Sequence, residues 1–148
     1  MERILKLKLP GGKFVVSEQR SRAMGAVRGS GNRTTELRLK MALVRSGVRG
    51  WTANRSDLPG KPDFYFESAR LAVFVDGCFW HGCGKCGHIP KTHQEFWATK
   101  IERNRNRHKK VSKLLKIERI RLLRFWEHQL RDDLHRCVRQ IVMRLPSK

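Results

Sequence analysis

Residues 62–81 have the sequence PDFYFESARLAVFVDGCFWH, and they predict two short strands followed by an irregular segment. We expect strands near 63–66 and 71–75, because aromatic and β-branched residues favour strands. The turn between them is expected at Glu67 and Ser68. Glycines and a proline recur through 76–91, which predicts a loop after the second strand.

A helix is predicted on the N-terminal side of this hairpin, over residues 34–46. Leu37, Met41 and Val44 recur at positions i, i+4 and i+7, which places them on one helical face. Gly47 follows the last of these residues and is suited to end the helix.

Two helices and a strand are predicted on the C-terminal side. Thr92 and Glu95 form a capping box for a helix running to about residue 116. Residues 119–125 predict a strand, and the apolar residues of 134–145 have helical spacing. The face predicted for the long helix contains Trp97, Ile101, Val111 and Leu115. The order α-β-β-α-β-α favours an α/β fold, with a mixed sheet flanked by helices on both faces.

The composition indicates a nucleic-acid partner. The chain has 148 residues, with 33 Lys and Arg against 13 Asp and Glu, for a net charge of +20. This length suits one domain, and the charge points to nucleic acid first and an anionic membrane surface second. No apolar run approaches the ~20 residues of a membrane-spanning helix, and no signal peptide is evident. We therefore expect a cytoplasmic protein.

The positive charge is concentrated on both sides of the predicted hairpin. Residues 1–20 are expected to form a basic N-terminal arm that is partly disordered. Residues 100–124 contain eleven basic residues and two acids, whereas 61–99 contains four of each. This layout suits a nuclease, because basic flanks can hold phosphates while the acidic middle binds a divalent metal. A basic stripe could also be only a solvated face; here it comprises Lys100, Arg103, Arg107 and Lys110.

Asp63 and Asp76 lie at the ends of the two predicted strands and could converge at one sheet edge. Paired carboxylate oxygens are suitable ligands for Mg²⁺, and the ion could activate water against a phosphodiester. His81 follows closely and could serve as general base. Pro-Asp pairs also occur in ordinary turns, so the pair alone is a weak signal.

Cys78, Cys83 and Cys86 have the spacing of a zinc site, which requires a fourth ligand. The candidates are His81, His88, His93, His128 and Cys137, of which His88 is nearest in sequence. Cys137 lies on the apolar face of the last predicted helix and is most simply a buried thiol. The alternative is that the three loop cysteines are unconnected.

Phe79, Trp80 and Trp97 form an aromatic group among basic residues. Large rings beside a basic groove can wedge between base pairs and unstack them. The alternative is that they belong to the core, and Trp97 on its apolar helical face suits that interpretation equally well.

Four motifs together resemble the very-short-patch repair (Vsr) DNA mismatch endonuclease family. They are DLPGKPD at 57–63, FVDGCFWH at 74–81, EFW with KIERN between 95 and 104, and FWE at 125–127. The resemblance extends from about residue 21 to 128, and residues 21–148 would form the endonuclease domain. It implies a restriction-endonuclease-like fold of the PD-(D/E)xK superfamily with a structural zinc.

The family resemblance also implies roles for single residues in catalysis. Asp63 would be the principal Mg²⁺ ligand, with the backbone carbonyl of Val75 beside it. His81 matches the general base, and Glu36 matches an acid that orients water. Asp76 is an additional acid, which could bind the metal or hold the tautomer of His81.

For DNA and zinc, the resemblance implies further assignments. Phe79, Trp80 and Trp97 match aromatics that intercalate beside the mismatch, and Met24 would enter the minor groove. The family's fourth zinc ligand follows the Trp-Glu pair, where this chain has a histidine. The implied zinc ligands are Cys78, Cys83, Cys86 and His128.

The resemblance implies a Mg²⁺-dependent endonuclease that nicks one DNA strand 5′ of the T in T:G mismatches, which arise by deamination of 5-methylcytosine. Such a cut initiates very short patch repair. A Vsr-like nickase without mismatch preference, acting in defence against foreign DNA, is the alternative. A zinc-stabilised binding module without catalysis is a third. We expect a monomer in the bacterial cytoplasm at the nucleoid, with mismatch-repair proteins as candidate partners and no membrane association.

Overall fold

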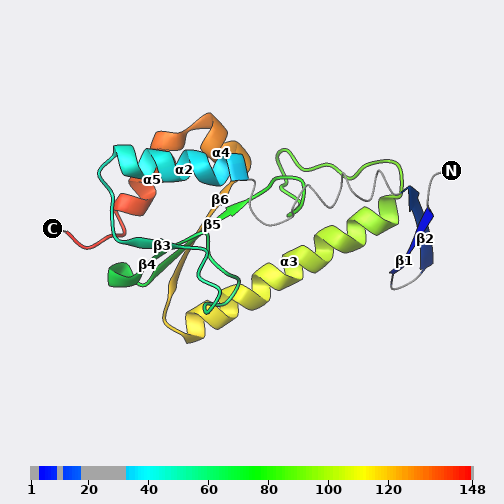
Figure 1. Ribbon diagram of the computed structural model, residues 1–148, viewed down its shortest axis with the longest axis horizontal. Coiled ribbons are helices and arrows are strands. Elements are labelled where there is room, and N and C mark those ends of the chain that lie inside the picture. Colours follow the sequence, from blue (N-terminus) through cyan, green and yellow to red (C-terminus); the bar gives the residue numbers. More distant parts are fainter. Residues whose placement is uncertain (1–3, 10–11, 18–32, 148) are drawn as a thin grey trace.

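The structure is a computed structural model that describes residues 4–9, 12–17 and 33–147. Within these ranges the chain forms strands, α-helices and one 3₁₀ turn (Figure 1). In chain order the elements are β1 Ile4–Leu9, β2 Gly12–Ser17, α2 Arg33–Arg45, β3 Trp51–Ala53, β4 Phe64–Phe66, η1 Glu67–Ala69, β5 Leu71–Asp76, α3 Gln94–Ile117, β6 Arg121–Trp126, α4 Glu127–Asp132 and α5 Leu134–Val142. No helix among the described residues has the length and apolar character needed to cross a membrane.

The main sheet has four strands in the order β3-β4-β5-β6. Its first three strands are antiparallel, and β6 joins β5 in parallel. Helices α2, α4 and α5 lie together on one side of this sheet and α3 lies on the other (Figure 1). The predicted mixed sheet with helices on both faces is therefore confirmed.

The central strand β5 separates two apolar cores. All six of its residues are buried, as expected for a strand with a neighbour on each edge and helices on both faces. Leu71, Val73 and Val75 pack into the core beneath α2, α4 and α5, whereas Ala72 and Phe74 pack into the core beneath α3. This alternation follows from the two-residue period of a strand.

Helix α2 buries a different face from the one predicted. Leu37, Met41 and Val44 are exposed, with Leu37 at 55%, whereas Leu39 and Leu43 are fully buried. The helix carries two apolar stripes, and the periodicity predicts the longer one as the core face, whereas the shorter one is buried. The buried stripe consists of Thr35, Leu39 and Leu43. Because Thr35 is polar, this stripe contains only two apolar residues and is less evident in the sequence than the exposed one. The end of the helix was predicted correctly at Gly47, where φ is +71°.

Helix α3 has the predicted length and face but not the predicted cap. Its N-cap residue is His93, which has a φ of 60° and makes no side-chain capping bond. The Thr92 capping box is therefore wrong, because the left-handed turn at His93 separates Thr92 from the first helical turn. The predicted buried residues are confirmed: Trp97, Ile101, Val111 and Leu115.

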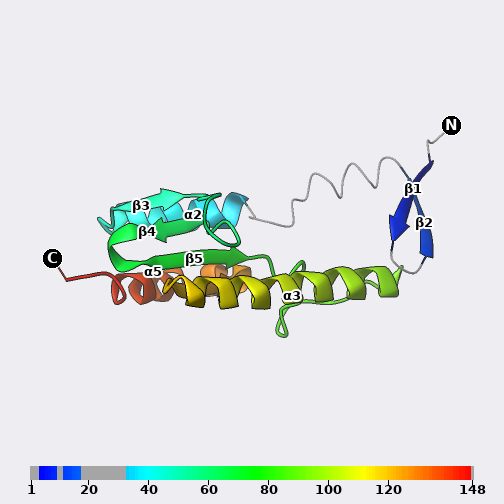
Figure 2. The same cartoon turned by 90° about the horizontal axis from the view of Figure 1, so that it is seen from below.

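Several short elements were not predicted. The edge strand β3 has only three residues, and α4 follows β6 without a loop. The antiparallel β1–β2 hairpin falls inside the predicted basic arm, and it is drawn near the N-terminal end of α3 in Figure 2. Its alternating sequence ILKLKL explains the strand character. The partial disorder predicted for residues 1–20 stays a prediction, and Met24 lies outside the described residues.

Candidate functional site

A cavity of about 320 Å³ opens between the carboxyl end of β5 and helix α3. It combines acidic, basic, histidine and aromatic side chains in one space. Its lining includes Asp63, Val75, Asp76 and His81, together with Lys61, Trp80, Lys100, Asn104, Arg107, His108 and Arg124. The two acids that flank the predicted hairpin therefore do reach the same cavity.

Asp63 is a buried carboxylate immediately before β4, only 9% exposed. Its Oδ2 accepts a hydrogen bond from the backbone N–H of Val75 at 2.7 Å. Burial, together with the nearby carboxylates of Glu36 and Asp76, raises the pKa of Asp63 to about 7, although the hydrogen bond from Val75 and the charge of Arg124 act in the opposite direction. A cation beside this carboxylate would offset both effects.

Asp76 differs from Asp63 because the protein itself supplies its counter-charge. This last residue of β5 accepts hydrogen bonds at both oxygens from Nη1 of Arg124, at 2.9 and 2.8 Å. Arg124 lies on the neighbouring strand β6, and its guanidinium also lies 4.6 Å from the centre of the Phe74 ring. The Nε2 of His108 is 3.9 Å from Oδ1 of Asp76.

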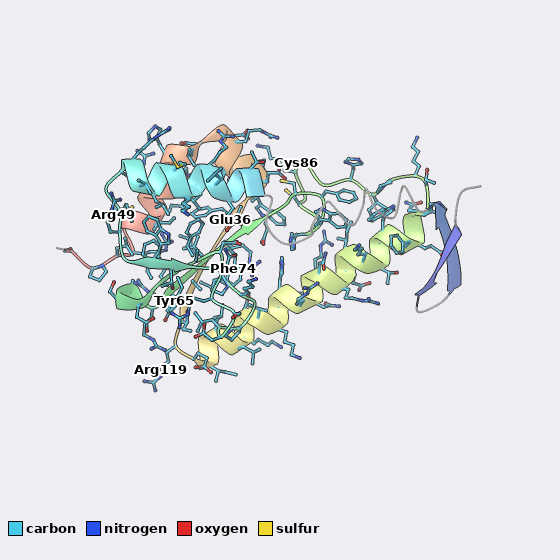
Figure 3. The ribbon with its side chains drawn as sticks, in the orientation of Figure 1. Glu36, Arg49, Tyr65, Phe74, Cys86 and Arg119 are labelled. Atoms are coloured by element: carbon cyan, nitrogen blue, oxygen red, sulfur yellow. The ribbon has the colours of Figure 1, made fainter. Side chains whose placement is uncertain are left out.

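Glu36 lies in the first turn of α2. Its Oε1 accepts a hydrogen bond from Asn54 at 3.4 Å. It is close enough to contribute to the raised pKa of Asp63, although it is outside the lining of the cavity. In Figure 3, Glu36 and Cys86 lie at the same end of the sheet, where β5 leads into the loop.

His81 lies in this loop, and its ring stacks on that of His108 from α3. The ring centres are 4.3 Å apart with an interplanar angle of 19°. Burial lowers the pKa of His108 to about 4, and the positive charge of Arg124 lowers it as well. His108 is therefore neutral at physiological pH.

The four residues assigned to zinc are brought together. The ligand atoms of Cys78, Cys83, Cys86 and His128 all lie within 4.8 Å of one another. Nδ1 of His128 is 3.3 Å from Sγ of Cys78 and 3.5 Å from Sγ of Cys83. A tetrahedral ion with ordinary zinc bond lengths would separate such atoms by about 3.6 Å. The donor set and its spacing therefore fit Zn²⁺.

The alternative fourth ligands do not join this cluster. His88, the nearest in sequence, is absent from the group and instead lies near Phe79, at 6.0 Å between ring centres. Cys137 is buried in the core beside α2. Burial raises the pKa of Cys137 to about 11, so this thiol stays protonated.

The aromatic group is compact and graded in exposure. Ring centres are 5.2 Å apart for Phe79 and Trp80, 5.4 Å for Phe79 and Trp97, and 5.8 Å for the two tryptophans. Trp97 is 8% exposed and supports the other two rings, which are half-buried. The Nζ of Lys100 lies 4.6 Å from the centre of the Trp80 ring.

The basic stripe divides between the cavity and the outer surface of α3. Lys100 and Arg107 line the cavity, whereas Arg103 and Lys110 are exposed outside its lining. One connected basic surface therefore runs from the candidate site along α3.

Several lining residues were not predicted from the sequence, above all Asn104, His108 and Arg124. A signal for two of them was present, because Asn104 and His108 interrupt the apolar stripe between Ile101 and Val111. A polar residue on a buried helical face requires a partner, and this pattern points to a site. Arg124 alternates with apolar residues in β6 and resembles an ordinary surface position.

Comparison with known proteins identifies the family. A family model described as DNA mismatch endonuclease Vsr matches residues 14–87. A type II nicking enzyme of Xanthomonas oryzae pv. oryzae is 40% identical over 116 residues, covering 78% of this chain and 84% of that protein. Another, from Neisseria meningitidis serogroup C, is 38% identical over 127 residues, covering 84% of each chain. The Escherichia coli protein named DNA mismatch endonuclease Vsr is 36% identical over 98 residues, covering 65% of this chain and 62% of that protein. The chain therefore belongs to the DNA mismatch endonuclease Vsr family, as its four motifs predicted.

Proposed function

We propose that this protein is a DNA endonuclease that nicks one strand 5′ of the T in T:G mismatches left by deamination of 5-methylcytosine, and so initiates very short patch repair. The observation that carries this proposal is the cavity in which Asp63, His81 and several cations meet beside half-buried aromatic rings. The names of the relatives support strand nicking. Family membership implies a restriction-endonuclease-like fold, with which the mixed sheet agrees.

Asp63 and the backbone carbonyl of Val75 would hold a catalytic Mg²⁺. The fit rests on charge, because Asp63 is buried near two other acids and, among the described residues, is not paired in a salt bridge as Asp76 is with Arg124. When bound, the ion supplies Lewis-acid chemistry that stabilises charge on a phosphate and makes water more acidic. The pairing with Arg124 favours a positioning role for Asp76 over direct ligation.

The protein's own side chains would perform the remaining steps of hydrolysis. His81 would accept the proton of the attacking water, as a general base facing the cavity. Glu36 would orient that water. Lys100 and Arg107 would hold the phosphates, and Arg103 and Lys110 would extend this contact along α3.

Zn²⁺ bound by Cys78, Cys83, Cys86 and His128 would have a structural role. It would tie the loop after β5 to the start of α4, which lie far apart in sequence. Phe79, Trp80 and His81 lie between the first two ligands. The zinc would therefore also fix the positions of two rings of the aromatic group and of the candidate general base.

Mismatch preference would come from the aromatic group. Phe79 and Trp80 are exposed enough to insert between base pairs, and Trp97 supports them from the core. Unstacking costs less at a mismatch than at a matched pair. A monomer suffices, because one cut in one strand requires one site. Mismatch-repair proteins remain candidate partners.

The test compares two duplexes that differ only in one base pair, T:G or T:A, with each strand carrying its own label. The proposal expects one nick, 5′ of the mispaired T, and much slower cutting of the matched duplex. Equal nicking of both duplexes would favour the alternative of a defence nickase without mismatch preference. Binding without cutting, with Mg²⁺ present, would leave only a zinc-stabilised binding module.

A further inference from the structure

Helix α3 holds three consecutive residues of the loop that carries the candidate base. Asn104 donates a hydrogen bond from Nδ2 to the backbone carbonyl of Trp80 at 2.7 Å. Arg105 donates from Nη2 to the carbonyl of Gly82 at 2.6 Å. Between them, the His108 ring lies on the ring of His81. Residues 77–93 form neither helix nor strand, so contacts of this kind must fix the loop.

His108, the α3 member of the stack, lies close to further polar residues on β5 and β6. His108 and Asn104 are four residues apart and therefore share one face of α3. The side chain of His108 is 22% exposed, and its Nε2 is 3.9 Å from Oδ1 of Asp76. Arg124 occupies both oxygens of that carboxylate. A chain of contacts thus runs from β6 through the end of β5 and α3 to His81.

Asp76, His81 and His108 could also be thought to share a metal ion, but packing explains their arrangement better. Ligand atoms of Asp76, His81 and His108 lie within 4.8 Å of one another. An imidazole binds a metal along the nitrogen lone pair, in the plane of its ring. Rings tilted by only 19° and stacked at 4.3 Å present lone pairs that run side by side instead of converging. Arg124 also competes for the carboxylate.

We propose that His108 is a positioning residue, whose flat ring holds the ring plane of His81 so that this base faces the cavity. His108 acts through packing and transfers no proton itself. The proposal rests on the proposed nuclease function for the role of His81. It predicts that another flat ring at position 108 can replace histidine, whereas an aliphatic side chain cannot.

The kinetic test uses His108→Phe and His108→Leu, with His135→Leu as the matched control at an exposed position on α5. Single-turnover cleavage and DNA affinity are measured separately. In His108→Leu we expect the cleavage rate to fall roughly tenfold or more, with little change in DNA Kd, because misplacing a reacting group costs rate. His108→Phe should stay within about threefold of the parent. In a His81→Ala background, adding His108→Leu should cause no further loss of rate.

A second readout does not depend on cleavage. Stacking shifts the ring-proton resonance of His81 upfield, and in protein labelled at histidine this signal is assigned by its loss in His81→Ala. It should remain shifted upfield, by as much or more, in His108→Phe and move downfield in His108→Leu, with circular dichroism and zinc content unchanged. An unmoved His81 resonance in His108→Leu overturns the proposal, as do equal rate losses in the two variants. If the parent cuts no DNA, the proposed function fails. The His81 resonance then tests by itself whether His108 holds the ring of His81.

Discussion

The carboxylate of Asp63 accepts a 2.7 Å hydrogen bond from the backbone N–H of Val75, across the hairpin of β4 and β5. The carbonyl of the same Val75 is the second candidate metal ligand. This hydrogen bond therefore holds the two candidate metal ligands, Asp63 and Val75, next to each other. Among the described residues, the buried carboxylate of Asp63 is not paired in a salt bridge as Asp76 is, so its ionisation costs the folded state stability.

That cost predicts how stability depends on pH when Mg²⁺ is absent. The pKa of Asp63 is raised to about 7 in the folded protein from an ordinary value of 3.8. The folded state therefore binds more protons between these values, and the contribution of Asp63 to stability is lost as pH rises from about 4 through 7. The free energy of unfolding of Asp63→Asn should exceed that of the parent by about 4 kcal/mol at pH 8, which is roughly 8–16 °C in Tm, and match it near pH 4.

Thermal melts in Mg²⁺-free buffer across this pH range check the prediction. Glu102→Gln, at an exposed position on α3, is the control and should show the same difference from the parent at each pH. An Asp63→Asn variant that is less stable than the parent at pH 8 would contradict the assigned origin of the shift.

The large elements were predictable because they rest on local periodicity. The continuous apolar run of β5 and the apolar stripe of α3 are visible in sequence, and the run locates Asp76 at a strand end. The face of α2 was not, because the choice between two apolar stripes depends on the sheet that packs against it. The capping box failed because the turn at His93 depends on the preceding loop.

The composition of the site was only partly predictable. Proximity in sequence favoured His88 as the fourth zinc ligand, and only the family resemblance pointed to His128. The fold brings His128 to the loop cysteines through β6 and α4, a connection that no local pattern contains. Arg124 and His108 join Asp76 in the same way, from two different elements.

The zinc assignment predicts a folding defect. Cys83→Ala should lose zinc and lower Tm by more than Asp63→Ala does, because a structural zinc contributes several kcal/mol to folding. Metal analysis of the purified protein and thermal melts provide the measurement. Cys137→Ala is the matched control, since that buried thiol lies in the core, and it should retain one zinc. If Cys83→Ala keeps its zinc and melts like the parent, the ligand set is wrong.

The role proposed for the aromatic group predicts that removing one ring reduces discrimination between mismatched and matched DNA. Trp80→Ala should reduce the ratio of cleavage rates on T:G and T:A duplexes by roughly tenfold or more, since ring–base stacking is worth about 1–3 kcal/mol. Trp51→Phe provides a control, because Trp51 packs against Phe64 and Phe66 at the far edge of the sheet. An unchanged ratio in Trp80→Ala would return that ring to a purely structural role.

We expect Arg103 and Lys110, the basic residues of α3 outside the cavity, to bind DNA without preference for sequence. Lys110→Gln should weaken affinity for T:G and T:A duplexes by the same factor and reduce the salt dependence by about one counterion. Fluorescence anisotropy at several salt concentrations measures both quantities. Arg139→Gln on α5 removes the same charge away from the candidate site and should leave the slope unchanged. A loss confined to the mismatched duplex would mean that Lys110 reads the mismatch.

The most direct test of the account is strand-resolved cleavage of a T:G duplex by the parent and by Asp63→Asn, each with and without Mg²⁺. If Asp63 holds the catalytic Mg²⁺, we expect one Mg²⁺-dependent nick, immediately 5′ of the mispaired T in that strand alone, and no nick with Asp63→Asn although DNA binding persists. Cleavage by Asp63→Asn at the parent's rate, or cuts in both strands, would contradict it.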